Sequence, residues 1–173
     1  MFQTVDPKAL PGNVFAAIGQ QWMLITAGTA GHYNTMTASW GGLGVLWGEP
    51  MATVFIRPQR YTKEFVDGSD YFTLSFFDEA YRPQLALCGS KSGRDVNKAE
   101  ECGFTVCTGA GGAPYFAQAR VVLVCRKVYR QKLDPAAMPP QVREKWYDGD
   151  YHEMYFGQIV EALVREEETP CSP

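Results

Sequence analysis

Short stretches in which apolar and polar residues alternate most constrain how this chain can fold. In YFTLSFF (71–77), apolar residues alternate with Thr73 and Ser75. MATVFIRP (51–58) shows the same period of two and stops at proline, and WMLITAGT (22–29) is apolar and ends in Gly and Thr. A period of two places successive side chains on opposite faces of a strand, so we predict strands in all three stretches.

Helical patterns are short by comparison. We predict about a turn and a half of helix at 62–66 and a second helix at 82–87. A third is expected at 95–102, with Asp95 as its N-cap and Gly103 at its end. Asp is a preferred N-cap residue, and Gly commonly follows the last helical turn.

The second half of the chain is also mainly strand-like. Residues 119–131 are β-rich, and in 154–166 apolar residues alternate with Glu161 and Arg165, which favours a strand over a helix at 158–166. Many short strands, few short helices and no strand–helix–strand repeat predict a β-barrel or sandwich. Three segments are expected to be irregular: a turn region at 108–115, the stretch 134–141 with its three prolines, and a frayed tail, EEETPCSP.

Length, charge and cysteine content exclude several classes of protein. The 173 residues, 46% hydrophobic and 20% charged, predict one globular domain (1–173) with a core at about 13–166. A net charge of −3 provides no basic footprint for nucleic acid. Five cysteines without a CxxC pair and only two histidines argue against a zinc or other metal site, so free, reduced thiols are expected.

The N-terminus and the hydropathy pattern give an expectation for location. The segment MFQTVDPKALPGN has neither the basic nor the apolar region of a signal peptide. No apolar run approaches the ~20 residues that span a bilayer. We therefore expect a soluble, cytoplasmic protein with no membrane partner.

The segment GSKSGRDVNK gathers groups that suit a phosphate, although the chain as a whole is acidic. A turn at Gly93 and the start of the next helix would direct N–H groups into one concavity, where Arg94 could bind two phosphate oxygens. The alternative is a solvated loop with ordinary capping. The groups in question are the glycines, hydroxyls and cations of Gly89, Ser90, Lys91, Ser92, Gly93, Arg94 and Lys98.

Two further segments lie beside predicted strands. NTMTASWGGLG (34–44) carries hydroxyls and glycines that let a ligand approach the backbone, and Trp40 could cover a flat ring. IRPQRYTKEF (56–65) places Arg57 and Arg60 around a proline, followed by a threonine that could cap a helix or bond a ligand oxygen. The plainer alternatives are an outward strand face for the first segment and a surface turn for the second.

The familiar nucleotide-binding fingerprints are missing. GGLGVLW lacks the third glycine of GxGxxG, and GAGGAP lacks it too and ends in proline. GSKSG lacks the GxxxxGK[ST] spacing. Neither a Rossmann fold nor a P-loop is supported.

The segments NTMTASWGG, IRPQRYTKEF, YFTLSFF and GSKSGRDVNKAEECGFT, in this order and spacing, resemble the flavin reductase-like family, nearest to its flavoredoxin branch. The similarity runs from about residue 22 to residue 105 and resumes at HEMYFGQI (152–159). The resemblance implies an FMN-binding split β-barrel, mainly β with flanking short helices and six antiparallel barrel strands. It also implies a homodimer that binds FMN near the subunit interface.

The resemblance also implies a cofactor site. Residues 34–40 would line the flavin, with hydrogen bonds from 37–40 to the ring or the ribityl chain. The loop cations and Ser92 would lie at the phosphate or ribityl end, so the phosphate is that of FMN. The residues expected to bind the cofactor are Asn34, Thr35, Met36, Thr37, Ala38, Ser39, Trp40, Arg57, Tyr61, Thr62, Lys91, Ser92, Gly93, Arg94, Lys98 and Tyr155.

Two residues of HEMYFGQI each have two interpretations. His152 is expected beside the flavin or nicotinamide pocket as a catalytic proton donor, and its alternative is a structural histidine near the start of a strand. Tyr155 either contacts the ligand or belongs to the barrel core.

The implied activity is that of an FMN-dependent oxidoreductase, in which NAD(P)H binds transiently and passes hydride to N5 of FMN for an acceptor further on. A first alternative is a flavoredoxin-type electron carrier that keeps FMN bound and is reduced by a partner protein. A second is a split-barrel module that has lost flavin function or holds another ligand such as heme.

Overall fold

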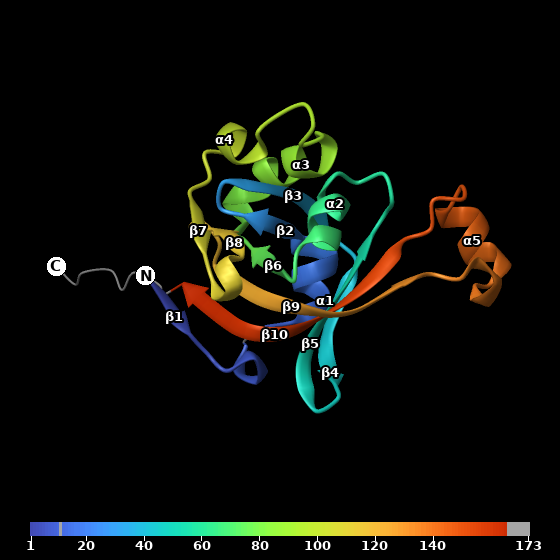
Figure 1. Cartoon of the computed structure of the whole chain (residues 1–173), viewed down its shortest axis with the longest axis horizontal. Coiled ribbons are helices and arrows are strands. Elements are labelled where there is room, and N and C mark those ends of the chain that lie inside the picture. The colour runs from blue at the N-terminus through green and yellow to red at the C-terminus, as the bar shows by residue number, and fades with distance from the viewer. Residues whose placement is uncertain (11, 166–173) are drawn as a thin grey trace.

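The computed structural model describes residues 1–10 and 12–165, and one antiparallel sheet organises them (Figure 1). The strands follow the order β3-β2-β6-β9-β10-β5-β4, and β1 pairs with the end of β10. A separate hairpin pairs β7 with β8. The bounds are β1 Phe2–Thr4, β2 Met23–Thr29, β3 His32–Ala38, β4 Gly41–Leu46, β5 Glu49–Ile56, β6 Tyr71–Phe76, β7 Val106–Thr108, β8 Pro114–Phe116, β9 Val121–Lys132 and β10 Glu153–Arg165.

The expected mainly β class is therefore confirmed, with one difference in detail. Along the described hydrogen-bonded path, β3 and β4 are the two outer strands, so the sheet is open rather than a closed barrel of six strands. β4 was not expected as a strand: it forms a hairpin with β5 through a turn in which Trp47 and Gly48 both have positive φ, 54° and 79°. Such a turn matches the twist of the flanking strands.

The helices are short and lie between strands. None of those in the described part of the chain is long and apolar enough to cross a membrane. The α-helices are α1 Val14–Ala16, α2 Thr62–Gly68, α3 Arg82–Ser90, α4 Lys98–Cys102 and α5 Pro140–Trp146, and α1 continues into a π-helical turn, Ala17–Gln21.

The three predicted helices are present, with shifted ends. The expected N-cap at Asp95 is wrong: α4 begins at Lys98, and the side chain of Asn97 accepts a hydrogen bond from the Glu100 N–H instead. Asp95 belongs to a preceding turn, in which its N–H donates to the Ser92 carbonyl. Gly103 ends the helix in the left-handed conformation, as predicted.

The expectation that 134–141 contains no regular element is also wrong. Pro135 begins a 3₁₀ turn and Pro140 begins α5. A proline fits the first position of a helix because its missing N–H would have no partner there and its φ is already helical. The turn region predicted at 108–115 spans the β7–β8 connection and includes the ends of both strands.

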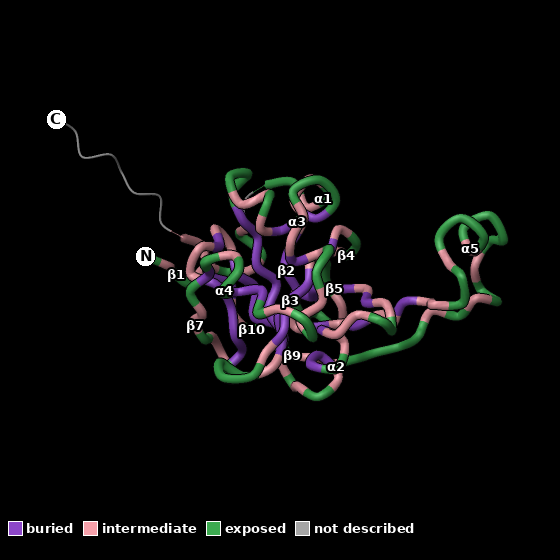
Figure 2. The backbone as a smooth tube through the Cα atoms, turned by 90° about the horizontal axis from the view of Figure 1, so that it is seen from above, coloured by how far each residue is buried: buried purple, intermediate pink, exposed green. Residues whose placement is uncertain are grey.

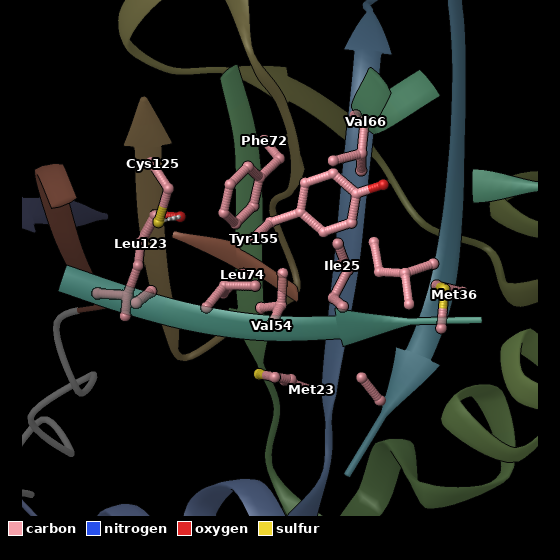
Figure 3. Packing of buried hydrophobic residues seen from close by; sticks show 14 of the residues in the cluster. Met23, Ile25, Met36, Val54, Val66, Phe72, Leu74, Leu123, Cys125 and Tyr155 are labelled. Atoms are coloured by element: carbon pink, nitrogen blue, oxygen red, sulfur yellow. Dashed lines mark hydrogen bonds between the residues drawn. The ribbon is translucent and has the colours of Figure 1, made fainter. Parts of the chain in front are cut away.

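Both faces of the central strands are buried, so the alternation in β6 separates two cores rather than core from solvent (Figure 2). Phe72 and Leu74 belong to an inner core, where Figure 3 shows Phe72 beside Tyr155 and Leu74 beside Val54. Thr73 faces the other way but is equally buried, because the β7–β8 hairpin covers it and the Pro114 carbonyl accepts its hydroxyl at 2.7 Å.

β10 is a strand from Glu153 to Arg165, so the helical alternative for 158–166 is wrong over this range. A bulge between Ile159 and Glu161 shifts its register against β9. Ile159 and Ala162 consequently both enter the inner core, while Val160 remains 41% exposed. The tail predicted to fray, EEETPCSP, lies outside the described residues.

β9 and β10 continue beyond the body of the molecule and carry α5 at their far end (Figures 1 and 2). We call residues 133–152, between these strands, the arm. Its helix exposes Val142 and Trp146, at 43% and 44%. The base of the arm returns to the body through an ion pair between Arg57 and Asp150.

Tyr155 offers a test of the inner core. Its ring is fully buried (Figure 3). Its hydroxyl donates to Asp67 Oδ1 at 2.7 Å. We expect Tyr155→Phe to lower the free energy of unfolding, measured in urea, by about 1.5 kcal/mol, because it leaves a charged acceptor with one donor fewer. Tyr129→Phe is the control, since that residue is 41% exposed and its hydroxyl donates to the uncharged side chain of Gln131. Equal losses in the two variants would contradict the prediction.

Candidate functional site

Two adjoining pockets of about 340 Å³ each open beside the end of β3. The loop pocket lies between β3, the residues after β5 and segment 90–93. The tryptophan pocket lies between the end of β3, β5 and the base of the arm. Met36, Arg57 and Arg60 line both, so the two pockets are continuous.

Most of the predicted site residues come together in these pockets. Three lie elsewhere: Thr35 and Arg94 line a neighbouring pocket, and Tyr155 is in the inner core with no exposed surface for a ligand. The predicted residues that line the loop pocket are Asn34, Met36, Arg57, Tyr61, Thr62, Lys91, Ser92, Gly93 and Lys98. Those that line the tryptophan pocket are Met36, Thr37, Ala38, Ser39, Trp40, Arg57 and His152.

Polar side chains of β3 are largely engaged with the protein itself. The hydroxyl of Thr35 shares a hydrogen bond with that of Thr26 on the neighbouring strand β2, at 2.8 Å. Thr37 donates to the Leu85 carbonyl and thereby fastens the strand to α3. Because buried hydroxyls need such partners, these two position the backbone of β3 rather than offer free donors.

Gly93 brings the loop into direct contact with β3. A Cβ atom at this position would lie 1.9 Å from Oδ1 of Asn34, which is well inside any possible contact distance. Asn34 is itself buried, and its amide nitrogen donates to Thr62 Oγ1 at 2.9 Å. The loop, β3 and the start of α2 therefore meet at one point on the pocket wall.

Lys98 anchors the loop at 89–98 through hydrogen bonds to neighbouring elements. Its ammonium is buried and donates to the carbonyls of Thr35 and Cys88, at 2.7 and 2.8 Å. Burial lowers the pKa of this lysine. Two of its three donors are thus used within the protein, and its main effect is to join α4 to β3 and α3.

Arg94 was predicted from the sequence as a phosphate ligand, but its positive charge is balanced by an acidic side chain. Its guanidinium pairs with Glu64 and lies over the ring of Tyr61, 4.3 Å from the centroid. It lines a neighbouring pocket of about 370 Å³ instead of the loop pocket. Arg94, the arginine of the GSKSGRDVNK segment, therefore points toward Glu64 rather than into the loop pocket.

Arg60 is the residue that the list of predicted ligands missed. It is half-buried between the two pockets and donates to the Gly89 carbonyl at 2.7 Å. Burial, and then the charge of Arg57, lower its pKa. Among the described residues no acidic side chain pairs with it, whereas Arg57 pairs with Asp150. The sequence showed both arginines around a proline but not which one is compensated.

Aromatic side chains build the tryptophan pocket. The ring of Trp40 lies 5.0 Å from that of His152 and 5.2 Å from that of Trp146, measured between centroids. Phe55 of β5 completes this wall. Trp146 is the last residue of α5, so the arm contributes to this pocket a side chain that is far from Trp40 in sequence.

His152 is neutral near neutral pH. Its ring is buried, and its Nδ1 lies 3.0 Å from the Tyr147 hydroxyl. Burial, followed by the positive charge of Arg57, lowers the pKa of His152 to about 4. A proton donor works best when its pKa lies near the working pH. The geometry therefore suits His152 as a wall of the pocket better than as a proton donor.

The low pKa of His152 predicts a pH-dependent stability. An unfolded histidine takes up a proton near pH 6.5, whereas the folded one resists it until about pH 4, so stability falls as the pH drops through this range. We expect the wild type to lose about 2 kcal/mol more than His152→Gln between about pH 7 and pH 4. Urea unfolding at several pH values measures this. Parallel profiles for the two proteins would contradict it.

The two pockets differ in the ligand chemistry that they suit. The Ser90 hydroxyl in the loop pocket already donates to the Ala86 carbonyl, at 2.9 Å. The donors that the loop pocket leaves for a ligand are the Arg60 guanidinium, the exposed ammonium of Lys91 and the hydroxyl of Ser92. Such donors bind phosphate groups. The tryptophan pocket offers aromatic edges and faces, which suit a planar ring. Together they offer donors for a phosphate and a wall for a planar ring on one open antiparallel sheet.

Comparison with known proteins identifies the family. The model of the flavin reductase like domain matches residues 15–171, so the chain belongs to this family. No curated protein matches the chain. The expected family is thus confirmed, and with it the split-barrel class of the fold.

Solved structures share this fold. The flavoredoxin of Methanosarcina acetivorans is 24% identical with a TM-score of 0.69, over 84% of this chain and 69% of that one. An FMN-binding domain of a flavin reductase-like enzyme from Shewanella baltica is 21% identical with a TM-score of 0.68, over 95% and 77%. An NADH:FAD oxidoreductase from Streptomyces globisporus is 16% identical with a TM-score of 0.63, over 84% and 75%.

Proposed function

We propose that this protein binds FMN across the loop and tryptophan pockets and acts as an NAD(P)H-dependent flavin reductase. The observation that carries the proposal is the continuity of a basic pocket with an aromatic one, joined at Arg60. FMN has the same two parts, a phosphate and a flat ring system. Membership of the flavin reductase-like family supports this assignment.

The donor set of the loop pocket fits a phosphate monoester, which carries about −1.5 to −2 charge at neutral pH. Arg60 and Lys91 supply two cations without an acidic partner among the described residues, and Ser92 adds a hydroxyl. Arg57 is neutralised by Asp150 and serves to hold the arm against the pocket. We therefore assign the phosphate to Arg60, Lys91 and Ser92.

The tryptophan pocket would hold the ring. Bound FMN would supply the hydride and electron chemistry of a reaction with NAD(P)H, so the protein need not supply a strong acid or base. Trp40 and Phe55 would cover apolar ring surface and exclude water, and the neutral His152 adds to that wall. Met36, at the junction, would lie beside the middle of the cofactor.

We also propose that the protein works as a homodimer. Trp40 and Trp146 at the mouth of the tryptophan pocket are 37% and 44% exposed. The arm that carries Trp146 projects away from the body (Figures 1 and 2). A second copy packed along the arm would cover these indoles and close the pocket from outside. Light scattering of the purified protein gives the oligomeric state, and a monomer would contradict this part.

An absorption spectrum under anaerobic conditions tests the activity. Flavin bands that bleach when NADPH or NADH is added support a reductase. Flavin bands that persist, and bleach only with a partner protein as donor, replace it with a flavoredoxin-type electron carrier. A protein that shows no flavin and binds no added FMN, or that shows a heme spectrum, overturns the proposal.

Trp40 offers a direct probe of the ring position. We expect Trp40→Phe to shift the flavin absorption bands or change the flavin fluorescence, because a smaller ring replaces an indole beside the isoalloxazine. Trp47→Phe is the matched control, since that indole is 67% exposed in the β4–β5 turn. Identical spectra for wild type and Trp40→Phe would place Trp40 away from the ring.

A further inference from the structure

Two thiols lie in contact at the base of the loop. Sγ of Cys88 is 3.7 Å from Sγ of Cys102. Cys88 belongs to the last turns of α3, and Cys102 is the final residue of α4. The segment between them, 89–101, contains the whole loop side of the proposed phosphate site. The two thiols therefore lie at the two ends of this loop, one on each side.

The pair differs from the other described cysteines. Cys88 is fully buried and Cys102 is half-buried, so a reagent in solvent can reach the second sulfur first. Cys125 is fully buried with its thiol toward the Leu123 carbonyl, and Cys107 lies on β7. The four described cysteines are all free, as expected from the sequence.

We propose that Cys88 and Cys102 form a reversible disulfide that locks the loop and slows the release of FMN. The second part rests on the proposed function, and the disulfide itself does not. A disulfide needs an S–S length of about 2.05 Å, so the two sulfurs must approach by about 1.6 Å from their present separation. Rotation of two side chains and a small shift of the short helix α4 can supply such a movement.

The oxidant is a small-molecule disulfide such as oxidised glutathione. The Cys102 thiolate attacks one of its sulfurs, which forms a mixed disulfide and releases one glutathione thiolate. The Cys88 thiolate then attacks Sγ of Cys102 and releases the second glutathione thiolate. The protein pair gives up two electrons and two protons, and the oxidant is reduced to two thiols.

The surroundings of the pair keep it reduced until an oxidant is present. Burial raises the pKa of Cys88 to about 12 and also raises that of Cys102. The nearby charge of Glu101 acts in the same direction on Cys102, while Lys98 opposes the increase for both thiols. Because the thiolate is the nucleophile, oxidation should be slow at neutral pH and faster under alkaline conditions.

The cross-link would act on the loop because Lys98 already ties the same elements together. Lys98 donates to the carbonyl of Cys88 itself, at 2.8 Å, from the first position of α4. A disulfide between α3 and α4 would hold this contact and restrict the backbone of Ser90 to Gly93. A loop held in its bound conformation loses less freedom on binding and releases its ligand more slowly.

The experiment treats the whole protein with oxidised glutathione at mildly alkaline pH. We expect peptide mass spectrometry to find a Cys88–Cys102 cross-linked peptide lacking two hydrogens. The thermal midpoint should rise by roughly 6–12 °C, since the cross-link closes a loop of about fifteen residues. FMN dissociation, followed by flavin fluorescence, should slow by about threefold or more. Dithiothreitol should reverse all three changes.

Matched variants make the result specific. Cys88→Ser and Cys102→Ser should each abolish the cross-link and the thermal shift, while Cys125→Ser should retain both. Thiols that stay free, or disulfides made from other cysteines, would overturn the proposal. A Cys88–Cys102 disulfide with unchanged FMN release would overturn its regulatory part. A disulfide with its thermal shift in a protein that binds no FMN would instead disprove the proposed function.

Discussion

Gly93→Ala is expected to destabilise the protein by about 3 kcal/mol and to abolish tight FMN binding. The new methyl group would lie 1.9 Å from Oδ1, 2.7 Å from Cγ and 3.0 Å from Nδ2 of Asn34, so the whole amide must move. That amide is buried and bonds Thr62, and its displacement combines overpacking with a lost hydrogen bond. Urea unfolding and FMN titration measure the two losses.

Two variants distinguish this clash from a general effect of alanine. Gly42→Ala is the matched control, because a Cβ there meets no atom within 4 Å, and we expect it to change stability by less than about 1 kcal/mol. Asn34→Ala removes the clashing amide. In that background Gly93→Ala should cost little, because close residues couple in a double-mutant cycle. A full loss in the double variant would contradict the steric explanation.

Arg60→Ala is expected to weaken FMN binding by about thirtyfold and to leave riboflavin binding within about twofold. A charge-assisted hydrogen bond to an ionised group contributes roughly 1.5–3 kcal/mol, and about 2 kcal/mol corresponds to thirtyfold. Riboflavin lacks the phosphate, so it separates the loss of this contact from damage to the ring site. Fluorescence titration of the apoprotein with each flavin measures both constants.

Arg94→Ala is the comparison that decides which arginine serves the phosphate. Its guanidinium is paired with Glu64 and lies over Tyr61, so we expect FMN affinity to change by less than about threefold. Arg60→Lys should recover part of the lost affinity, since it retains the charge. The assignment to Arg60 would be contradicted if Arg60→Ala lost equal affinity for FMN and riboflavin. It would also be contradicted if Arg94→Ala weakened FMN binding more, and the phosphate contact would then be assigned to Arg94.

Elements with a clear local pattern were predictable. The alternation in β5 and β6 and the glycine stop of α4 depend on neighbours a few residues apart, and all are present. Local preferences for helix starts have a limit, shown by the misplaced cap at Asp95 and by the unexpected α5. Asn97 is as good an N-cap as Asp95, and Pro140 can begin a helix as well as interrupt one. Local preference allowed either choice, and the surrounding structure selected one.

Most residues of the candidate site could be predicted from the sequence, but the role of each residue could not. Most residues of segment 34–40, together with residues 90–93 and Lys98, do converge on two joined pockets. The sequence contained no signal that Trp146 would join them, because the arm reaches the pocket only through the long strands β9 and β10. Tyr155 was left open between ligand and core, and its burial places it in the core.

The sequence by itself determined the family, through the resemblance of its motifs. It also determined the mainly β class and the groups available for a phosphate and a flat ring, because these follow from residue types and short-range periodicity. Only the tertiary structure decided which cations are free. Arg57 meets Asp150 across 93 positions, Arg94 meets Glu64 across 30, and Arg60 meets the Gly89 carbonyl across 29. A charge is compensated by whatever the fold brings within a few ångströms of it, and separation along the chain does not encode that distance.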